Sequence, residues 1–193
     1  MSESIVSRAF DEIAGLVSSI ASDQELRAAV SRAGDMALAA IRGKNKLLFA
    51  GNGGSAAEAQ HIAAEYVSRF KFDRPGLPAV ALTTDTSILT AIGNDYGYEN
   101  IFVRQLEAIG RPGDLLFLSS TSGRSQNILL AVAAARQLDV ATVLLTGAAY
   151  RPVADGPDLV IAVPSLVTAR IQEVHLMIGH TICEFVEHQM FGS

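Results

Sequence analysis

Hydrophobic residues near the start of the chain recur at the spacing of two amphipathic helices. Apolar residues between positions 5 and 20 repeat every three or four positions, which places them on one helical face. Ser22 or Asp23 can cap a second helix over 24–41, which Gly43 ends. Two helices ahead of the first strand predict an extension that wraps the sheet or pairs with another subunit.

After residue 43, short apolar runs alternate with helical stretches. The runs lack an alternation of polar and apolar residues, which is typical of strands covered on both faces. We predict strands at 46–50, 78–82, 114–119, 140–145 and 158–163, and helices at 55–70, 99–109, 125–138 and 167–190. The pattern indicates an α/β fold with a parallel, helix-covered sheet. We expect a single domain over 1–193, with a helical extension (1–43) and an α/β core (44–193).

A glycine-rich turn, GNGGS at 51–55, connects the first predicted strand to its helix. Glycine permits positive φ, Ser55 is a natural N-cap, and Glu58 completes a capping-box pattern. A strand, a glycine turn and a helix N-terminus together favour an anion site. The turn lacks the Lys-Ser/Thr of a P-loop and the third glycine of a dinucleotide motif. A plain tight turn is the alternative.

His61 and Glu65 stand at i and i+4 of that helix, on one face. They could form an acid/base pair or bind a metal. The alternative is an ordinary surface pair, which contributes only a few tenths of a kcal/mol.

Polar residues also gather after the second and third predicted strands, at 83–87, 93–95 and 119–125. Ligands of such folds bind beyond the carboxyl ends of the strands. The hydroxyl-rich SSTSGRS segment at 119–125 could hold a phosphate with hydroxyls and helix-start amides, without a lysine. A solvated serine-rich loop is the alternative.

The last predicted helix carries Gln172, His175, His180, Glu184 and His188. Spacing alone does not select any of them for a site. We interpret His188, close to the chain end, as a surface residue.

Composition narrows the function classes. A net charge of −5 argues against non-specific nucleic-acid binding. Cys183 is the single cysteine, so an intrachain disulfide is excluded, as expected of a cytoplasmic protein. The sequence has no signal peptide and no apolar run of membrane-spanning length. We expect a soluble, cytoplasmic protein that binds neither nucleic acid nor membrane.

Three motifs together resemble the phosphoheptose isomerases of the SIS (sugar isomerase) domain family: GNGGSAAEAQHIAAE at 51–65, SSTSGRS at 119–125, and RIQEVH followed by a histidine within 170–180. The resemblance covers essentially the whole chain, including 74–99. It implies a three-layer α/β/α sandwich with a five-stranded parallel sheet, in a homotetramer. It also implies interconversion of sedoheptulose 7-phosphate and D-glycero-D-manno-heptose 7-phosphate, the first step towards the ADP-heptose of lipopolysaccharide cores. Ala169 departs from some relatives, which have an acidic residue there, so no carboxylate role is expected at that position.

The resemblance also implies functions for individual residues. The zinc ligands fall on His61, Glu65, Gln172 and His180. The catalytic base and acid fall on Glu65 and His180. The substrate contacts fall on Asn52, Gly53, Gly54, Ser55, Glu65, Asn94, Asp95, Ser120, Thr121, Ser122, Ser125 and Gln172. These residue types suit the reaction, because an enediol mechanism needs a base, an acid and stabilisation of oxyanion charge, and zinc accepts nitrogen and oxygen ligands.

Two alternatives belong to other classes. The same fold occurs in a non-catalytic, replication-initiator-associating binding protein that resembles this chain in several stretches. That protein lacks equivalents of Glu65 and His180, which this chain has. The other alternative is a sugar-phosphate-sensing regulatory domain, but nothing here resembles an attached DNA-binding module.

Gln172 and His180 are eight residues apart on one predicted helix, which is about 12 Å of axial rise. Two side chains so separated cannot easily reach one zinc ion at distances of about 2 Å. Either the helix starts after Gln172, or it bends, or a neighbouring subunit provides one ligand. We predict the third arrangement, with active sites between the subunits of a homotetramer.

Overall fold

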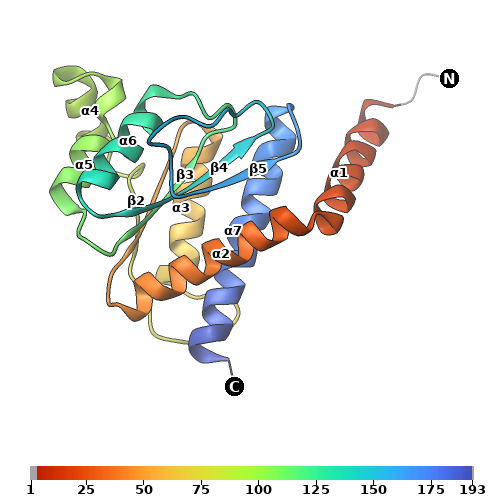
Figure 1. Cartoon of the computed structure of the whole chain (residues 1–193), viewed down its shortest axis with the longest axis horizontal. Coiled ribbons are helices and arrows are strands. Elements are labelled where there is room, and N and C mark those ends of the chain that lie inside the picture. The colour runs from red at the N-terminus through yellow and green to blue at the C-terminus, as the bar shows by residue number, and fades with distance from the viewer. Residues whose placement is uncertain (1–3, 193) are drawn as a thin grey trace.

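The apolar runs form the strands of one parallel sheet (Figure 1). The computed structural model describes residues 4–192. In chain order the elements are α1 (Ile5–Ser22), α2 (Gln24–Arg42), β1 (Leu47–Gly51), α3 (Gly54–Val67), β2 (Ala79–Ala81), α4 (Thr86–Asp95), the 3₁₀ turn η1 (Tyr98–Asn100), α5 (Val103–Ile109), β3 (Leu115–Ser119), α6 (Gln126–Gln137), β4 (Ala141–Gly147), β5 (Leu159–Val163) and α7 (Thr168–Phe191).

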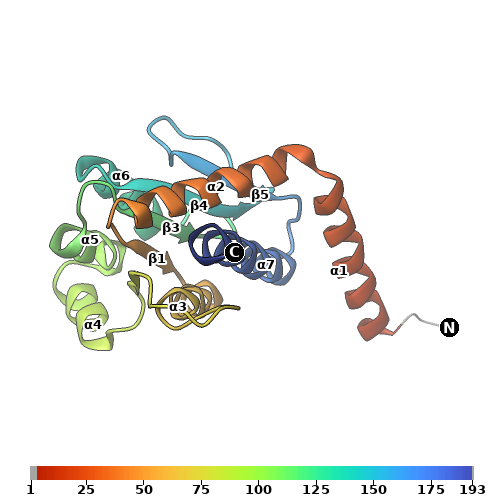
Figure 2. The ribbon, with the colours of Figure 1, turned by 90° about the horizontal axis from the view of Figure 1, so that it is seen from below.

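The sheet separates two hydrophobic cores. Helices α2, α3 and α7 cover one face, where the rings of Phe49 and Phe117 stack with centroids 5.3 Å apart. Helices α4, α5 and α6 lie on the other face, over Leu48 and Leu116 (Figure 2). Neighbouring residues of β1 and β3 therefore enter different cores, which explains why the runs show no polar alternation. The predicted three-layer sandwich and its five strands are confirmed.

The helices match the predictions less uniformly. Both N-terminal helices are present, and α6 and α7 lie within a residue of their predicted bounds. The expected helix over 99–109 is divided into η1 and α5, and α3 ends at Val67 rather than at residue 70. Helix α4 was not predicted. It begins where the Asp85 carboxylate accepts the backbone N–H of Ile88, at 2.9 Å.

The strand order β2-β1-β3-β4-β5 reverses direction between β1 and β3. From β1 the chain moves to β2 on one side, whereas β3, β4 and β5 follow one another on the other. The last residues of the two central strands, Gly51 and Ser119, are paired in register. In open parallel sheets a ligand crevice lies at this reversal. The GNGGS and SSTSGRS segments both leave the sheet there.

Helices α3 and α7 run parallel and approach closely at two glycines. A Cβ on Gly179 of α7 would lie 2.7 Å from Cδ1 of Ile62, and a Cβ on Gly54 of α3 would lie 2.8 Å from Nε2 of Gln172. A side chain at Gly179 would displace Ile62, whose Cγ1 also lies within 2.9 Å of that position, whereas one at Gly54 would displace only the end of the flexible Gln172 side chain. This packing fixes which residues of the two helices face each other.

Helix α1 projects from the rest of the molecule (Figures 1 and 2). Of its residues, only Ile20 is buried, while Ile5 is 76% and Phe10 68% exposed. Leu16 packs against the core, whereas Ile5, Val6 and Phe10 near the start of α1 have no partner within the described residues that covers them. Within residues 4–192, every helix is too short or too polar to cross a bilayer.

Candidate active site and metal centre

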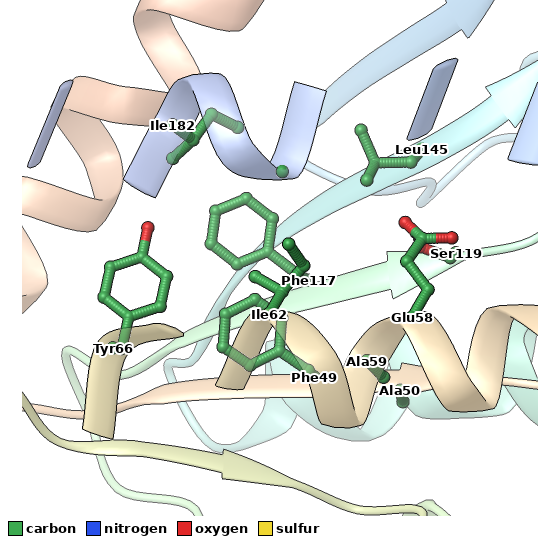
Figure 3. A pocket seen from close by; sticks show the side chains of 11 residues that line it. Phe49, Ala50, Glu58, Ala59, Ile62, Tyr66, Phe117, Ser119, Leu145 and Ile182 are labelled. Atoms are coloured by element: carbon green, nitrogen blue, oxygen red, sulfur yellow. The ribbon is translucent and has the colours of Figure 1, made fainter. Parts of the chain in front are cut away.

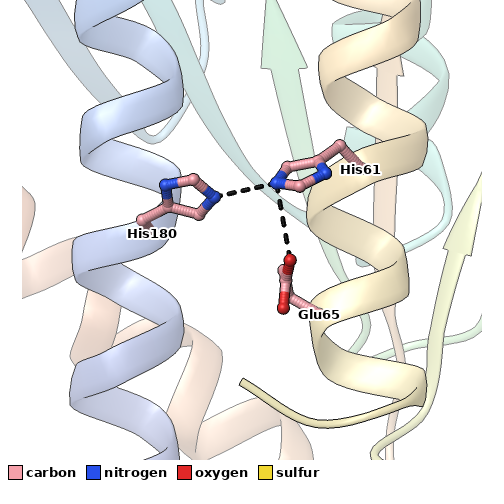
Figure 4. A group of neighbouring side chains, drawn as sticks. All are labelled: His61, Glu65 and His180. Carbon is pink, nitrogen blue, oxygen red and sulfur yellow. Dashed lines mark hydrogen bonds and ion pairs between the residues drawn. The ribbon is translucent and has the colours of Figure 1, made fainter. Parts of the chain in front are cut away.

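Three of the predicted site residues meet between α3 and α7 (Figure 4). The Nε2 atoms of His61 and His180 lie 2.8 Å apart, and His61 Nε2 lies 3.4 Å from a carboxylate oxygen of Glu65. One ligand atom from each residue falls within 4.8 Å of the other two. The expected pairing of His61 and Glu65 on one helical face is thus confirmed, with His180 as a third member.

The chemistry of this cluster fits a metal ion. Two imidazole nitrogens and a carboxylate oxygen form a set that zinc accepts, and catalytic zinc sites commonly use three protein ligands. All three side chains come from regular helices, so their directions are set by helix packing.

Gln172 does not join the cluster in this chain. Helix α7 is continuous from Thr168, so the idea that the helix starts after Gln172 is wrong. The side chain of Gln172 packs on Gly54, at the start of α3, about two helical turns from His180. It lies instead beside the glycine turn.

The glycine turn differs in detail from the prediction. Of its glycines only Gly53 has positive φ, at 56°, and it is the N-cap of α3. The expected capping box is wrong, because the helix begins one residue earlier and Ser55 is buried against Gly51, only 2% exposed. The Ser55 N–H donates to the Asn52 carbonyl, at 3.0 Å. Because this N–H is already bonded and the side chain is buried, neither of them is free for a ligand.

Asn127 ties this turn to α6 and was not found from the sequence. Its amide exchanges two hydrogen bonds with the amide of Asn52, at 2.8 and 2.9 Å, and Asn127 is buried. The Tyr98 hydroxyl donates to the same Asn52 oxygen, at 3.0 Å. The only sequence signal was an asparagine in the first turn of a helix next to the serine-rich loop.

The serine-rich loop folds tightly above β3. The Ser120 N–H donates to the Leu145 carbonyl, and the Ser120 and Ser125 hydroxyls lie 3.3 Å apart. Ser125 is the N-cap residue of α6, but its side chain makes no cap hydrogen bond. The Ser122 hydroxyl accepts the N–H of Arg124, at 3.2 Å. The Ser125 hydroxyl therefore stands next to the amides that open α6.

Asn94 and Asp95 are not brought to this crevice within the chain. They form the exposed C-terminal end of α4, where the Asn94 amide donates to the Asp95 carboxylate, at 2.7 Å. Helix α3 lies between α4 and α7 in both views (Figures 1 and 2).

Among the other candidates of α7, His175 is wholly buried and its Nε2 bonds the Thr146 carbonyl, while His188 is exposed as expected. Burial lowers the pKa of His175 to about 4, so this histidine is a neutral residue of the core.

Glu58, expected to cap the helix, instead points into a pocket between α3, α7 and the sheet (Figure 3). Phe49, Ile62, Phe117 and other apolar side chains line this pocket, whose cavity of ≈ 20 Å³ has room for about one water. The Ser119 hydroxyl donates to the Glu58 carboxylate, at 3.3 Å. Burial raises the pKa of Glu58 to about 7, although this hydrogen bond acts in the opposite direction.

The fold and this site together define an α/β protein with a parallel sheet that reverses its order between β1 and β3, and with a His–Glu–His cluster between α3 and α7. A family model described as SIS domain matches residues 10–147, so the chain belongs to the SIS domain family.

Comparison with individual proteins narrows the class. The chain is 51% identical over 188 residues to the phosphoheptose isomerase of Burkholderia pseudomallei (strain 1710b), covering 97% of this chain and 95% of that one. It is 60% identical over 151 residues to that of Roseiflexus sp. (strain RS-1), covering 78% and 77%. The structure of phosphoheptose isomerase GmhA from Neisseria gonorrhoeae aligns with a TM-score of 0.85 at 40% identity, covering 94% and 96%. The protein is therefore an enzyme, a sugar-phosphate isomerase, and the resemblance seen in its sequence is confirmed.

The raised pKa of Glu58 predicts a pH-dependent cost to stability. The unfolded chain ionises this carboxyl above about pH 4.5, whereas the folded chain keeps it protonated up to about pH 7. Stability contributed by this residue therefore falls as pH rises through that window, by about 3 kcal/mol at most. Glu58→Gln removes the effect, so its stability relative to wild type should rise by about 2–3 kcal/mol between pH 5 and pH 8. Urea denaturation at the two pH values measures this.

Glu12→Gln, on exposed α1, is the matched control and should show no such rise. A Glu58→Gln difference that stays constant between the two pH values would contradict the assignment.

Proposed function

We propose that the enzyme interconverts sedoheptulose 7-phosphate and D-glycero-D-manno-heptose 7-phosphate in the cytoplasm, the first step towards ADP-heptose for lipopolysaccharide cores. The observation that carries the proposal is the meeting of His61, Glu65 and His180 between α3 and α7. The phosphoheptose isomerases to which the chain is similar over most of its length support this choice of substrate.

The residues of the cluster suit an enediol mechanism. Conversion of a 2-ketose into an aldose moves a proton between C1 and C2. We assign Glu65 as the base that takes the carbon-bound proton and His180 as the acid that serves the substrate oxygens. The side chain of Glu65 is 22% exposed, which leaves it accessible to a substrate while limiting its contact with water.

His61, Glu65 and His180 would hold the zinc ion that we propose as cofactor, one in each subunit. A bound zinc would supply Lewis-acid stabilisation of the charge that develops on the substrate oxygens. The position of Gln172 beside Gly54 supports a contact with substrate more than a fourth metal bond.

The phosphate is proposed to bind where the two loops leave the sheet. Ser120, Thr121, Ser122 and Ser125 would provide hydroxyls, and the start of α6 would provide amides. Asn52, Gly53 and Gly54 approach from the opposite loop, held there by Asn127. Ser55, being buried, is left out of the proposed contacts.

The sequence left two alternatives, a non-catalytic binding protein with this fold and a sugar-phosphate sensor, and the similarity to phosphoheptose isomerases argues against both. Neither alternative needs a carboxylate and an imidazole that meet a second imidazole between α3 and α7. The cluster therefore favours the isomerase.

Incubation of the purified protein with sedoheptulose 7-phosphate, followed by NMR, should show the aldose product. Glu65→Gln and His180→Gln should each lower turnover about 100-fold or more, because each removes a proton-transfer group. Zinc content, measured on the same samples, separates loss of metal from loss of the acid or base. His188→Gln, on the exposed end of the same helix, is the control. Absence of product, or near-normal turnover in either site variant, would overturn the proposal.

The phosphate site makes a different kinetic prediction. Ser125→Ala should raise KM about tenfold and leave kcat nearly unchanged, because phosphate contacts are made equally in ground and transition states. A hydrogen bond to a charged group supplies a loss of this size. Ser22→Ala, at the end of α1, should leave both constants unchanged. A fall in kcat alone would place Ser125 elsewhere in the mechanism.

We also propose that the enzyme is a homotetramer with active sites between subunits. The uncovered apolar face of α1 supports burial against another copy. Because Glu65 and His180 meet within one chain, any sharing between subunits falls on Gln172, Asn94, Asp95 or other substrate contacts.

Phe10→Glu should reduce the assembly to smaller species, because it puts a charge in the centre of the exposed apolar face of α1. Light scattering coupled to size-exclusion chromatography measures the mass. Ser19→Glu, at an exposed position half a turn around α1 from Phe10, should leave the mass unchanged. Equal masses for wild type and Phe10→Glu would argue against α1 as the contact.

A further inference from the structure

The connection between α3 and β2 packs against α7 near the cluster of His61, Glu65 and His180. We refer to residues 68–78 as the α3–β2 loop. It leaves the end of α3 just after Glu65 and crosses α7 before entering the sheet. Its backbone has little regular structure, so its position depends on side chains that hold it.

Glu187 of α7 holds this loop by its backbone. Its carboxylate accepts three consecutive N–H groups, those of Phe70 at 3.0 Å, Lys71 at 2.6 Å and Phe72 at 3.1 Å. The side chain of Glu187 is 1% exposed. A buried carboxylate is retained only when its oxygens are fully bonded, and these N–H groups meet that need.

Arg74 completes the arrangement and joins it to α3. Its Nε donates to Glu187, at 2.9 Å, and its side chain is 2% exposed. The same guanidinium donates to the carbonyls of Glu65, at 2.9 Å, and Tyr66, at 2.8 Å. The ion pair therefore connects the loop, the last turn of α3 and the last turns of α7.

The loop also contacts the cluster of His61, Glu65 and His180 directly. The ring of Phe70 stacks on the imidazole of His180, with centroids 5.5 Å apart and planes inclined by 27°. On the α3 side of the cluster, Arg74 donates a hydrogen bond to the backbone carbonyl of Glu65. One buried ion pair thus fixes both the backbone of the proposed base and the ring that covers the proposed acid.

We propose that Arg74 and Glu187 are positioning residues, which hold the α3–β2 loop so that Phe70 fixes the His180 ring with Nε2 facing His61 and Glu65. This rests on the proposed function, because it assigns His180 and Glu65 to the metal and the proton transfers. A purely structural role for the loop would affect folding but would leave the orientation of the His180 ring unchanged.

Two matched phenylalanine variants test the proposal. Phe70→Leu removes the ring that covers His180, while Phe72→Leu removes a ring of the same loop that lies against His188, 6.5 Å away. In metal-stripped protein, the nuclear Overhauser contacts between the His180 and His61 rings should weaken in Phe70→Leu and persist in Phe72→Leu. Zinc affinity should fall about tenfold in Phe70→Leu, as for other residues that orient metal ligands. Phe70→Tyr, which keeps the aromatic ring, should bind zinc with the affinity of the wild type.

Glu187→Gln tests the holding interaction itself. Amide exchange at residues 70–72 should become faster, and zinc affinity should fall in the same direction as in Phe70→Leu. Glu184→Gln is the control, because Glu184 pairs with Lys71 of the same loop on the exposed surface, at 2.5 Å. If Glu187→Gln does not fold, the phenylalanine variants decide.

The outcomes separate this inference from the proposed function. Unchanged contacts between the His180 and His61 rings in Phe70→Leu, or equal losses of zinc affinity in Phe70→Leu and Phe72→Leu, would overturn the positioning role even in an active isomerase. A wild-type protein that binds no zinc would contradict the metal site, and the contacts between the two rings would then decide the role of the loop alone.

Discussion

The close parallel contact between α3 and α7 is the constraint on which the site depends. Gly179 lets α7 approach until Ile62 of α3 fills the space of the missing side chain. With a larger residue at Gly179 the helices would separate, and His180, the next residue, would move away from His61. The distance of 2.8 Å between the two imidazole nitrogens is therefore a result of helix packing, and a rigid pair of helices can hold ligand directions well.

Much of this arrangement was accessible from the sequence. The strands are short, mainly apolar runs, and in β1 and β3 every residue is buried, so the pattern located them within a residue or two. The His61/Glu65 pair followed from helical spacing alone. The choice of His180 over His175 came only from the family resemblance, since both are histidines on one helix. What separates them is burial, because His175 faces Thr146 in the core and His180 faces His61.

The features that the sequence did not predict share a physical cause, which is that tertiary contacts override local patterns. Ser55 has the chemistry of a helix cap, but Gly51 leaves room for it in the core, and the helix starts before it. The partners of Glu187 lie 113 to 117 positions earlier in the chain. A single glutamate near the end of a helix gives no signal that it holds a loop so distant in sequence. Asn127 escaped notice for the same reason, because its partner Asn52 belongs to another loop.

The position of α7 after all five strands has a consequence for synthesis. Every strand has been made by Val163, so the sheet can form before the last helix exists. Until α7 arrives, the face of the sheet that carries Phe117 and Leu145 is covered incompletely, because this helix packs there. His180 then joins His61 across 119 positions of sequence. The site is thus completed only after every strand of the sheet has been made.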